Sequence, residues 1–132
     1  MPSKKNSYTL ILTQSPVQNE CNLTAQSLVE AIITAGDTID RVFFYQDAVY
    51  VGLKPQVPGQ GLTTTYQGWL KLQEMQSFPL QLCIANSLRR GVIDEAEADR
   101  YSQSANLMAG FQLSGLGEMA EATQSSDRII RL

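Results

Sequence analysis

The stretch Pro79-Leu-Gln-Leu-Cys-Ile-Ala-Asn-Ser-Leu-Arg-Arg-Gly-Val92 indicates the fold class of this chain. Its first part, Leu80 to Ile84, is a short apolar run that is typical of a buried strand. Residues 85–90 then favour a turn of helix, which Gly91 ends. A strand that leads directly into a helix is the repeating unit of α/β folds.

Cys83 lies near the carboxyl end of this expected strand, the edge at which open α/β sheets bind their ligands. Helix amides and the arginines at 89 and 90 favour the thiolate, which is the nucleophilic form of cysteine. The same residues also suit a purely structural role. Cysteine is among the most buried residue types, and Arg before Gly is a common end of a helix. Taken alone, the residues favour the structural role, because buried cysteines outnumber reactive ones.

Composition excludes several classes of function. With 132 residues, of which 43% are hydrophobic and 17% charged, the chain is expected to fold as one globular domain, 1–132. Its net charge of −3 argues against direct binding of nucleic acid. The absence of histidine excludes Ser-His and Cys-His nucleophile pairs within the chain, and the two cysteines are not spaced as metal ligands. We expect neither a metal nor a cofactor.

The amino-terminal end carries no pattern of a signal peptide, and no stretch approaches the length of a membrane span. The sequence therefore predicts a cytoplasmic protein, and we expect residues 1–7 to form a disordered tail. Cys21 and Cys83 do not make a disulfide framework, so both should be thiols in a reducing compartment. Cys21 falls just before an expected helix, where it can serve as an accessory thiol or be an incidental loop residue.

Strand and helix patterns alternate along the chain, which predicts a parallel sheet with helices on both faces. The pattern leaves the strand order open. Residues 49–51 suit either a short extended piece or a helical turn. We expect strands at 8–13, 41–45, 80–84, 111–114 and 127–132, and helices at about 22–35, 66–76, 85–90, 94–104 and from 117 onward.

Caps and apolar spacings define the expected helices more closely. Asn22 is a candidate cap of the first helix, and Asp94 with Glu97 forms a variant of the capping box. In the first helix one apolar face is expected from Leu28, Ala31, Ile32 and Ala35. In the last helix one face is expected from Leu116, Met119, Ala120 and Thr123.

Three further features allow more than one interpretation. The segment Gly115-Leu-Gly-Glu-Met-Ala120 fits a dinucleotide-binding pattern, but too little chain follows it, and a tight turn into a helix is favoured. The loop 54–65 is either a solvated connector or a surface that binds a partner. Four aromatic residues suit either the core or a subunit interface: Tyr50, Tyr66, Trp69 and Phe78.

Several segments resemble one known family. The segment Leu82 to Val92 is similar to the active-site segment of the DsrE/TusD family of sulfurtransferases. The segment Val42-Phe-Phe-Tyr-Gln-Asp-Ala-Val-Tyr50 looks like the second strand of that family and the turn after it. Residues 110–122 and the end Asp127-Arg-Ile-Ile130 resemble its last third. The resemblance covers nearly the whole chain from Tyr8.

This resemblance implies a three-layer α/β/α sandwich with a five-stranded, mainly parallel sheet. It also implies that Cys83 carries sulfur as a persulfide. Asn86, Ser87, Arg89 and Arg90 are then candidates to stabilise that persulfide. The implied partners are TusB-like and TusC-like subunits in a heterohexamer, a TusA-like sulfur donor and a TusE-like acceptor. The implied pathway is synthesis of 2-thiouridine at the wobble position of tRNA, without direct contact with nucleic acid or membrane.

Two alternatives stay open at the level of sequence. A DsrE subunit of a DsrEFH complex has a similar cysteine segment and serves dissimilatory sulfur oxidation. A non-catalytic subunit that keeps the fold as an interaction module is the other alternative. An inert, buried Cys83 would favour the second alternative.

Overall fold

The computed structural model describes residues 5–17, 20–57 and 64–132, and its centre is a five-stranded sheet in which all neighbouring strands are parallel. The strand order is β4-β3-β2-β1-β5. This confirms the expected α/β sandwich and supplies the order that the pattern left open. The strands are β1 (Ser7–Leu12), β2 (Thr38–Phe44), β3 (Leu80–Cys83), β4 (Phe111–Ser114) and β5 (Arg128–Arg131).

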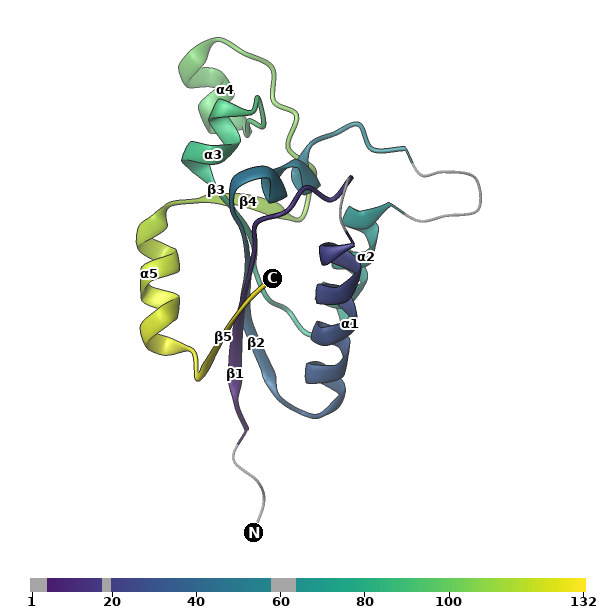
Figure 1. Ribbon diagram of the computed structural model, residues 1–132. Coiled ribbons are helices and arrows are strands. Elements are labelled where there is room, and N and C mark those ends of the chain that lie inside the picture. The colour runs from purple at the N-terminus through teal and green to yellow at the C-terminus, as the bar shows by residue number, and fades with distance from the viewer. Residues whose placement is uncertain (1–4, 18–19, 58–63) are drawn as a thin grey trace.

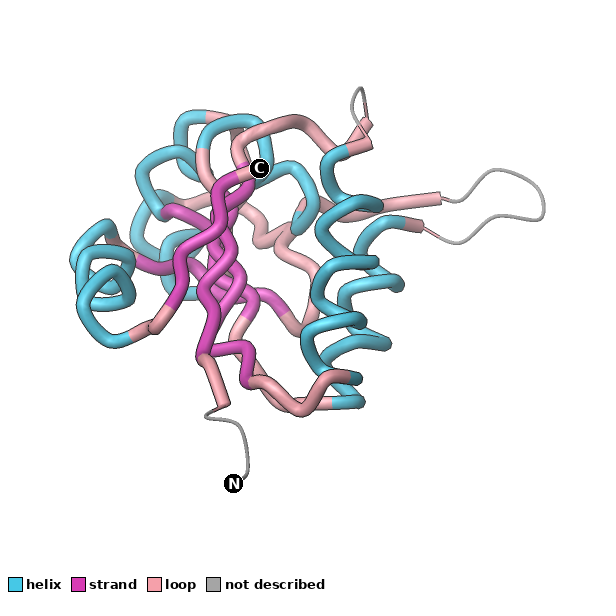
Figure 2. The backbone as a smooth tube through the Cα atoms, turned by 60° about the horizontal axis from the view of Figure 1, so that its bottom comes forward, coloured by secondary structure: helices cyan, strands magenta, loops and turns pink. Residues whose placement is uncertain are grey.

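Helices cover both faces of this sheet. The helices are α1 (Cys21–Thr34), α2 (Thr65–Met75), α3 (Ile84–Arg89), α4 (Glu95–Tyr101) and α5 (Leu116–Ser125), with a 3-10 helix η1 (Gln46–Gly52) after β2. Figure 1 shows α1 and α2 on one face, α5 on the other, and α3 and α4 beyond the carboxyl ends of the strands. Figure 2 shows the twisted strands between these layers.

The placement of the helices follows from the strand order. Steps from β1 to β2 and from β2 to β3 move across the sheet in one direction, and the step from β4 to β5 moves back. Because crossovers between parallel strands are right-handed, a reversed step places its helix on the opposite face. The helix α5 therefore packs alone on the face that α1 and α2 leave uncovered.

The main core lies between the sheet and the pair α1 and α2. The aromatic ring of Trp69 on α2 packs edge-on against Phe44 with ring centroids 5.5 Å apart. The strands alternate, so that one set of apolar side chains faces this core: Leu10, Leu12, Val42, Phe44, Leu80 and Leu82. Trp69 and Phe78 are buried in the core, whereas Tyr50 and Tyr66 are half-buried. The first two are thus core residues of this chain.

One expectation about α1 is wrong, and another is confirmed only in part. Asn22 does not cap the helix, because α1 already begins at Cys21 and the cap position is Glu20. Asn22 is instead buried inside the helix, where its Oδ1 accepts a hydrogen bond from Trp69 Nε1 at 2.8 Å. The buried face is made by Asn22, Ala25, Val29 and Ile32. Of the expected apolar face, Ile32 is buried and Leu28 packs half-buried against the core, whereas Ala31 and Ala35 are exposed.

The apolar face expected for α5 is also wrong. Of α5 only Ala122 is buried, and Leu116 is 47% exposed. The sheet face beneath α5 carries Gln81 beside the buried Phe43, and Gln81 Nε2 donates a hydrogen bond to Glu118 Oε2 at 2.9 Å. A polar contact thus helps to hold α5, and most apolar side chains of the helix stay exposed or half-buried.

Local turn chemistry is mostly as expected. Asp94 caps α4 by accepting a hydrogen bond from the backbone N–H of Glu97, and Gly115 stands at the tight turn from β4 into α5. The helix α4 ends at Tyr101, earlier than expected, because Ser102 adopts the left-handed conformation with φ 55°. Residues 46–52 form η1, the helical one of the two expected forms.

The ends of the chain and the long loop are described in part. The strand β1 begins at Ser7, a residue expected in the tail, while residues 1–4 lie outside the described residues. Residues 58–63 of the loop 54–65 also lie outside them, so its expected roles stay predictions. Within the described part, the helices are too short or too polar to cross a membrane.

Candidate functional site

Cys83 is the last residue of β3 and the cap residue of α3. Its position follows from the sequence: the apolar strand is paired on both sides, and the chain then turns at once into the helix. Residues two apart in a strand share a face, so Cys83 lies on the same face as Gln81, which contacts α5. The thiol is thus at the carboxyl edge of the sheet, as expected, and it is only 1% exposed.

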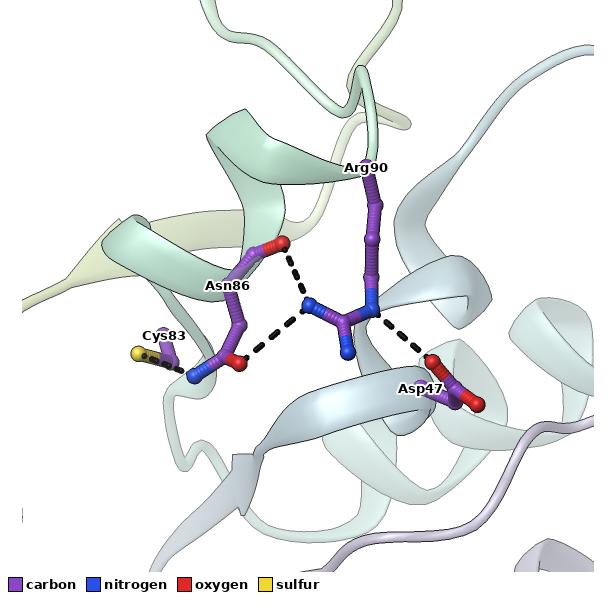
Figure 3. Close-up of polar contacts among 4 residues, drawn as sticks. All are labelled: Asp47, Cys83, Asn86 and Arg90. Atoms are coloured by element: carbon purple, nitrogen blue, oxygen red, sulfur yellow. Dashed lines mark hydrogen bonds and ion pairs between the residues drawn. The ribbon is translucent and has the colours of Figure 1, made fainter.

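Asn86 is the direct polar partner of this thiol. Its Nδ2 donates a hydrogen bond to Cys83 Sγ at 2.9 Å (Figure 3). The two residues are three positions apart, which is the spacing of neighbours on one face of a helix. Asn86 is itself 8% exposed. A buried amide N–H that is directed at sulfur stabilises the thiolate or a persulfide anion more than the neutral thiol.

Arg90 lies one helical turn beyond Asn86 and binds its other end. The Nη1 atom of Arg90 donates to the backbone oxygen of Asn86 at 3.2 Å and to Asn86 Oδ1 at 3.3 Å. The Nε atom of Arg90 donates to Asp47 Oδ1 at 2.8 Å, which forms an ion pair between α3 and η1. Figure 3 shows the four residues as one chain of contacts that ends at the sulfur.

The sequence predictions named Asn86 and Arg90 but missed Asp47. Cysteine, Asn86 and Arg90 follow one another at helical spacing, which is a signal that sequence alone can supply. Asp47 is 43 residues from Arg90, and nothing in its local pattern connects the two. Its place depends on η1, which packs closely on β3 because Gly52 leaves room for the side chain of Leu82.

The remaining candidate residues do not join this chain of contacts. Arg89 is exposed and lines a cavity with Leu88, Gly91 and Tyr101. Ser87 is fully buried, and its Oγ has no hydrogen-bond partner among the described residues. Cys21 is half-buried at the start of α1, which follows the carboxyl end of β1, so it lies at the same edge of the sheet but is separated from β3 by β2.

The arrangement suits nucleophilic chemistry of sulfur. It provides one thiol at the start of α3, an amide that donates a hydrogen bond to the thiol, and a guanidinium group that binds the oxygen of that amide. Over residues 5–17, 20–57 and 64–132 there is no group of three or more acidic, cysteine or histidine side chains that could hold a metal ion. Transfer of a sulfur atom between thiols proceeds by thiolate attack on a sulfur–sulfur bond.

The fold and this cysteine edge define a class of protein. The sequence model of the DsrE/DsrF-like family matches residues 6–132, so the chain belongs to that family. This confirms the resemblance that the sequence segments indicated.

Individual relatives narrow the comparison. The chain is 35% identical over 125 residues to proteins named sulfurtransferase TusD homolog in Vibrio vulnificus strains YJ016 and CMCP6, covering 94% of this chain and 95% of each relative. A crystal structure of the ychN protein from E. coli is similar in fold, with a TM-score of 0.75 at 23% sequence identity. The match covers 96% of this chain and 99% of that one.

Proposed function

We propose that this protein is a sulfur-carrying sulfurtransferase subunit in which Cys83 holds sulfane sulfur as a persulfide. The observation that carries the proposal is the position of Cys83 at the carboxyl end of β3, with the Asn86 amide directed at its sulfur. Membership in the DsrE/DsrF-like family and the similarity to proteins named TusD homolog support it.

The proposed step is an exchange between a persulfide and a thiolate. The Cys83 thiolate attacks the outer sulfur of a donor persulfide, so that a new sulfur–sulfur bond forms at Cys83. The sulfur–sulfur bond of the donor breaks, and the donor leaves as a thiolate. An acceptor thiolate then attacks the outer sulfur on Cys83 in the same way. Electrons balance in each exchange, and no oxidant or reductant is consumed.

The partners follow from the same proposal. A TusA-like protein is the donor and a TusE-like protein the acceptor, and TusB-like and TusC-like subunits complete a heterohexamer in the cytoplasm. The pathway is synthesis of tRNA wobble 2-thiouridine. The DsrE-type pathway of sulfur oxidation uses the same step at Cys83, so the acceptor that takes the sulfur distinguishes the two pathways.

One observation favours a different candidate. Cys83 is 1% exposed, and a thiol that exchanges sulfur with another protein needs to be reached. An inert structural cysteine in a non-catalytic subunit would look the same. The two candidates differ in what is expected of Cys83, because the carrier requires partner docking or local opening at α3 to expose the sulfur.

We expect Cys83→Ser to abolish sulfur loading while the chain stays folded, because serine has no thiolate and is close to cysteine in size. The experiment incubates the protein, as the complex with its partner subunits, with a cysteine desulfurase, cysteine and a TusA-type donor. Intact mass and peptide mapping then locate any added sulfur on the wild type, Cys83→Ser and Cys21→Ser.

The expected result is one added sulfur on Cys83 that is lost on reduction, present in Cys21→Ser and absent from Cys83→Ser. Circular dichroism controls for folding of each variant. Absence of added sulfur in the wild type, with Cys83 resisting alkylation in the folded protein, would support the structural subunit instead. Loss of loading in Cys21→Ser alone would assign the carrier role to Cys21.

A further inference from the structure

Asp47 is the outermost member of the chain of contacts that ends at Cys83. We propose that Asp47 is a positioning residue: acting through Arg90, it holds the Asn86 amide on the Cys83 sulfur and so stabilises Cys83 as the thiolate that leaves when carried sulfur passes to an acceptor. This inference rests on the proposed function, and it adds a residue from another part of the fold and a chemical task for it.

The orientation of Asn86 depends on Arg90. The two ends of a carboxamide have nearly the same shape, but only the nitrogen end can donate a hydrogen bond. A guanidinium group donates and cannot accept, so the Oδ1 of Asn86 must face Arg90, 3.3 Å away. The NH2 group is thereby left facing Cys83 Sγ. Without Arg90 the carboxamide can turn over and place its oxygen against the sulfur, where it would repel an anion.

The position of Arg90 depends in turn on Asp47. An arginine side chain has many rotamers, and fixing one of them costs conformational entropy. Here the guanidinium is held on two sides, by Asp47 at Nε and by Asn86 at Nη1. Asp47 lies on a different element, η1, so the ion pair does not form by helical spacing. The residue before it, Gln46, has φ 53°, a conformation that non-glycine residues seldom adopt, and this turn starts the 3-10 helix that carries Asp47.

Burial changes along this chain of contacts. The side chains of Asp47 and Arg90 are 59% and 24% exposed, while Asn86 and Cys83 are nearly inaccessible. Exposure therefore falls from the ion pair to the sulfur. A carried persulfide adds one sulfur atom, about 2 Å further out than Sγ, where a thiolate can attack it. Such attack forms a sulfur–sulfur bond between the attacking thiol and the outer sulfur, breaks the bond from that sulfur to Sγ, and releases Cys83 as a thiolate.

Asn86 stabilises this leaving thiolate if Asp47 and Arg90 keep the carboxamide in place. Its Nδ2 donates to Cys83 Sγ, the atom that takes up negative charge as the sulfur–sulfur bond breaks, and a stabilised thiolate leaves faster. Release of Asn86 should therefore lengthen the lifetime of the persulfide under attack by a thiol.

The test uses the chain with Cys21→Ser in all samples, so that only Cys83 can carry sulfur. Inorganic polysulfide loads the thiolate: a sulfur–sulfur bond forms at Cys83 and a shortened polysulfide leaves with the electron pair. Excess glutathione then challenges the protein, and mass spectrometry follows the half-life of the persulfide. The variants are Asp47→Asn, Asp47→Glu, Asn86→Leu, the double variant Asp47→Asn with Asn86→Leu, and Arg100→Gln, which removes an exposed ion pair within α4 as a matched control.

We expect the half-life to rise about fivefold in Asp47→Asn, the size of effect of one net hydrogen bond, and to return to the parent value in Asp47→Glu. Asn86→Leu should lengthen the half-life at least as much, and the double variant should have the same half-life as Asn86→Leu, because Asp47 acts only through Asn86. Arg100→Gln should match the parent. In labelled protein the side-chain amide signals of Asn86 should lose their protection from solvent exchange in Asp47→Asn and keep it in Arg100→Gln.

An unchanged half-life in Asp47→Asn, or additive effects in the double variant, would overturn the role of Asp47. Unchanged Asn86 amide signals in Asp47→Asn would overturn it as well. If the parent protein takes up no sulfur on Cys83 either alone or as the complex with its partner subunits, the proposed function fails and the role of Asp47 with it. Loading that succeeds in every variant with equal half-lives removes only the role of Asp47.

Discussion

At the scale of single residues, one buried hydrogen bond joins two helices of this protein. Asn22 on α1 accepts a hydrogen bond from the indole of Trp69 on α2, and both residues are buried. A polar group in the core costs free energy unless it has a partner. This hydrogen bond therefore fixes how the two helices face each other on the main core.

We expect Asn22→Ala to destabilise the protein by about 1–3 kcal/mol, because it leaves the indole N–H of Trp69 buried without an acceptor. Urea unfolding followed by circular dichroism measures the loss. In a Trp69→Phe background the same substitution should cost clearly less, since phenylalanine has no N–H to leave unpaired. Equal costs in both backgrounds would show that the hydrogen bond contributes nothing to stability.

At the scale of elements, the site depends on how closely η1 approaches β3. A Cβ atom added at Gly52 would lie 2.6 Å from Leu82 Cδ2 and 3.0 Å from Leu107 Cδ1. Leu82 is fully buried and directly precedes Cys83, so it has little freedom to move aside. The absence of a side chain at position 52 thus brings the element that carries Asp47 against the strand that carries the thiol.

Gly52→Ala should destabilise the protein by about 1–3 kcal/mol through overpacking against Leu82. The matched substitution is Gly117→Ala in α5, where nothing lies within 4 Å of an added Cβ; it should raise the free energy of unfolding by about 0.5–1 kcal/mol, because glycine is unfavourable in a helix. Thermal and urea unfolding of both variants measure the contrast. If both substitutions had the same effect, the close approach of η1 would not be a constraint.

At the scale of the whole molecule, the fold places its two thiols in different environments. Cys83 is buried where β3 passes into α3, whereas Cys21 is half-buried at the start of α1. A buried group reacts with a reagent only through openings of the structure, and its rate is lowered by the free energy of that opening.

In the folded chain without partners, we expect iodoacetamide to modify Cys21 on the order of tenfold faster than Cys83. Timed alkylation with peptide mapping measures both rates, and Cys21→Ser and Cys83→Ser identify the peptides. In denaturing urea the two rates should become similar, because burial is lost. A Cys83 that reacts as fast as Cys21 in the folded protein would mean that the edge of β3 opens readily without a partner.

The sequence by itself determined the fold class, the alternation of strands and helices, and the position of the thiol. These follow from local patterns: short apolar runs, helical spacing, glycine at Gly91 and Gly115, and the cap at Asp94. The helical spacing of Cys83, Asn86 and Arg90 also lies within one short segment, so most of the candidate site was predictable from it.

Only the tertiary structure decided the strand order, the faces of α1 and α5 that are buried, and the contact between Asp47 and Arg90. The apolar spacing of α5 predicted the wrong buried face. Burial depends on the surface against which a helix packs, and here that surface carries Gln81, which binds Glu118. Asn22 was predicted as a cap because asparagine is a preferred cap residue. Its actual partner, Trp69, is 47 residues away and is not visible in the local pattern. Contacts between residues so far apart leave no trace in a local pattern, since they exist only once right-handed crossovers and packing have brought the elements together.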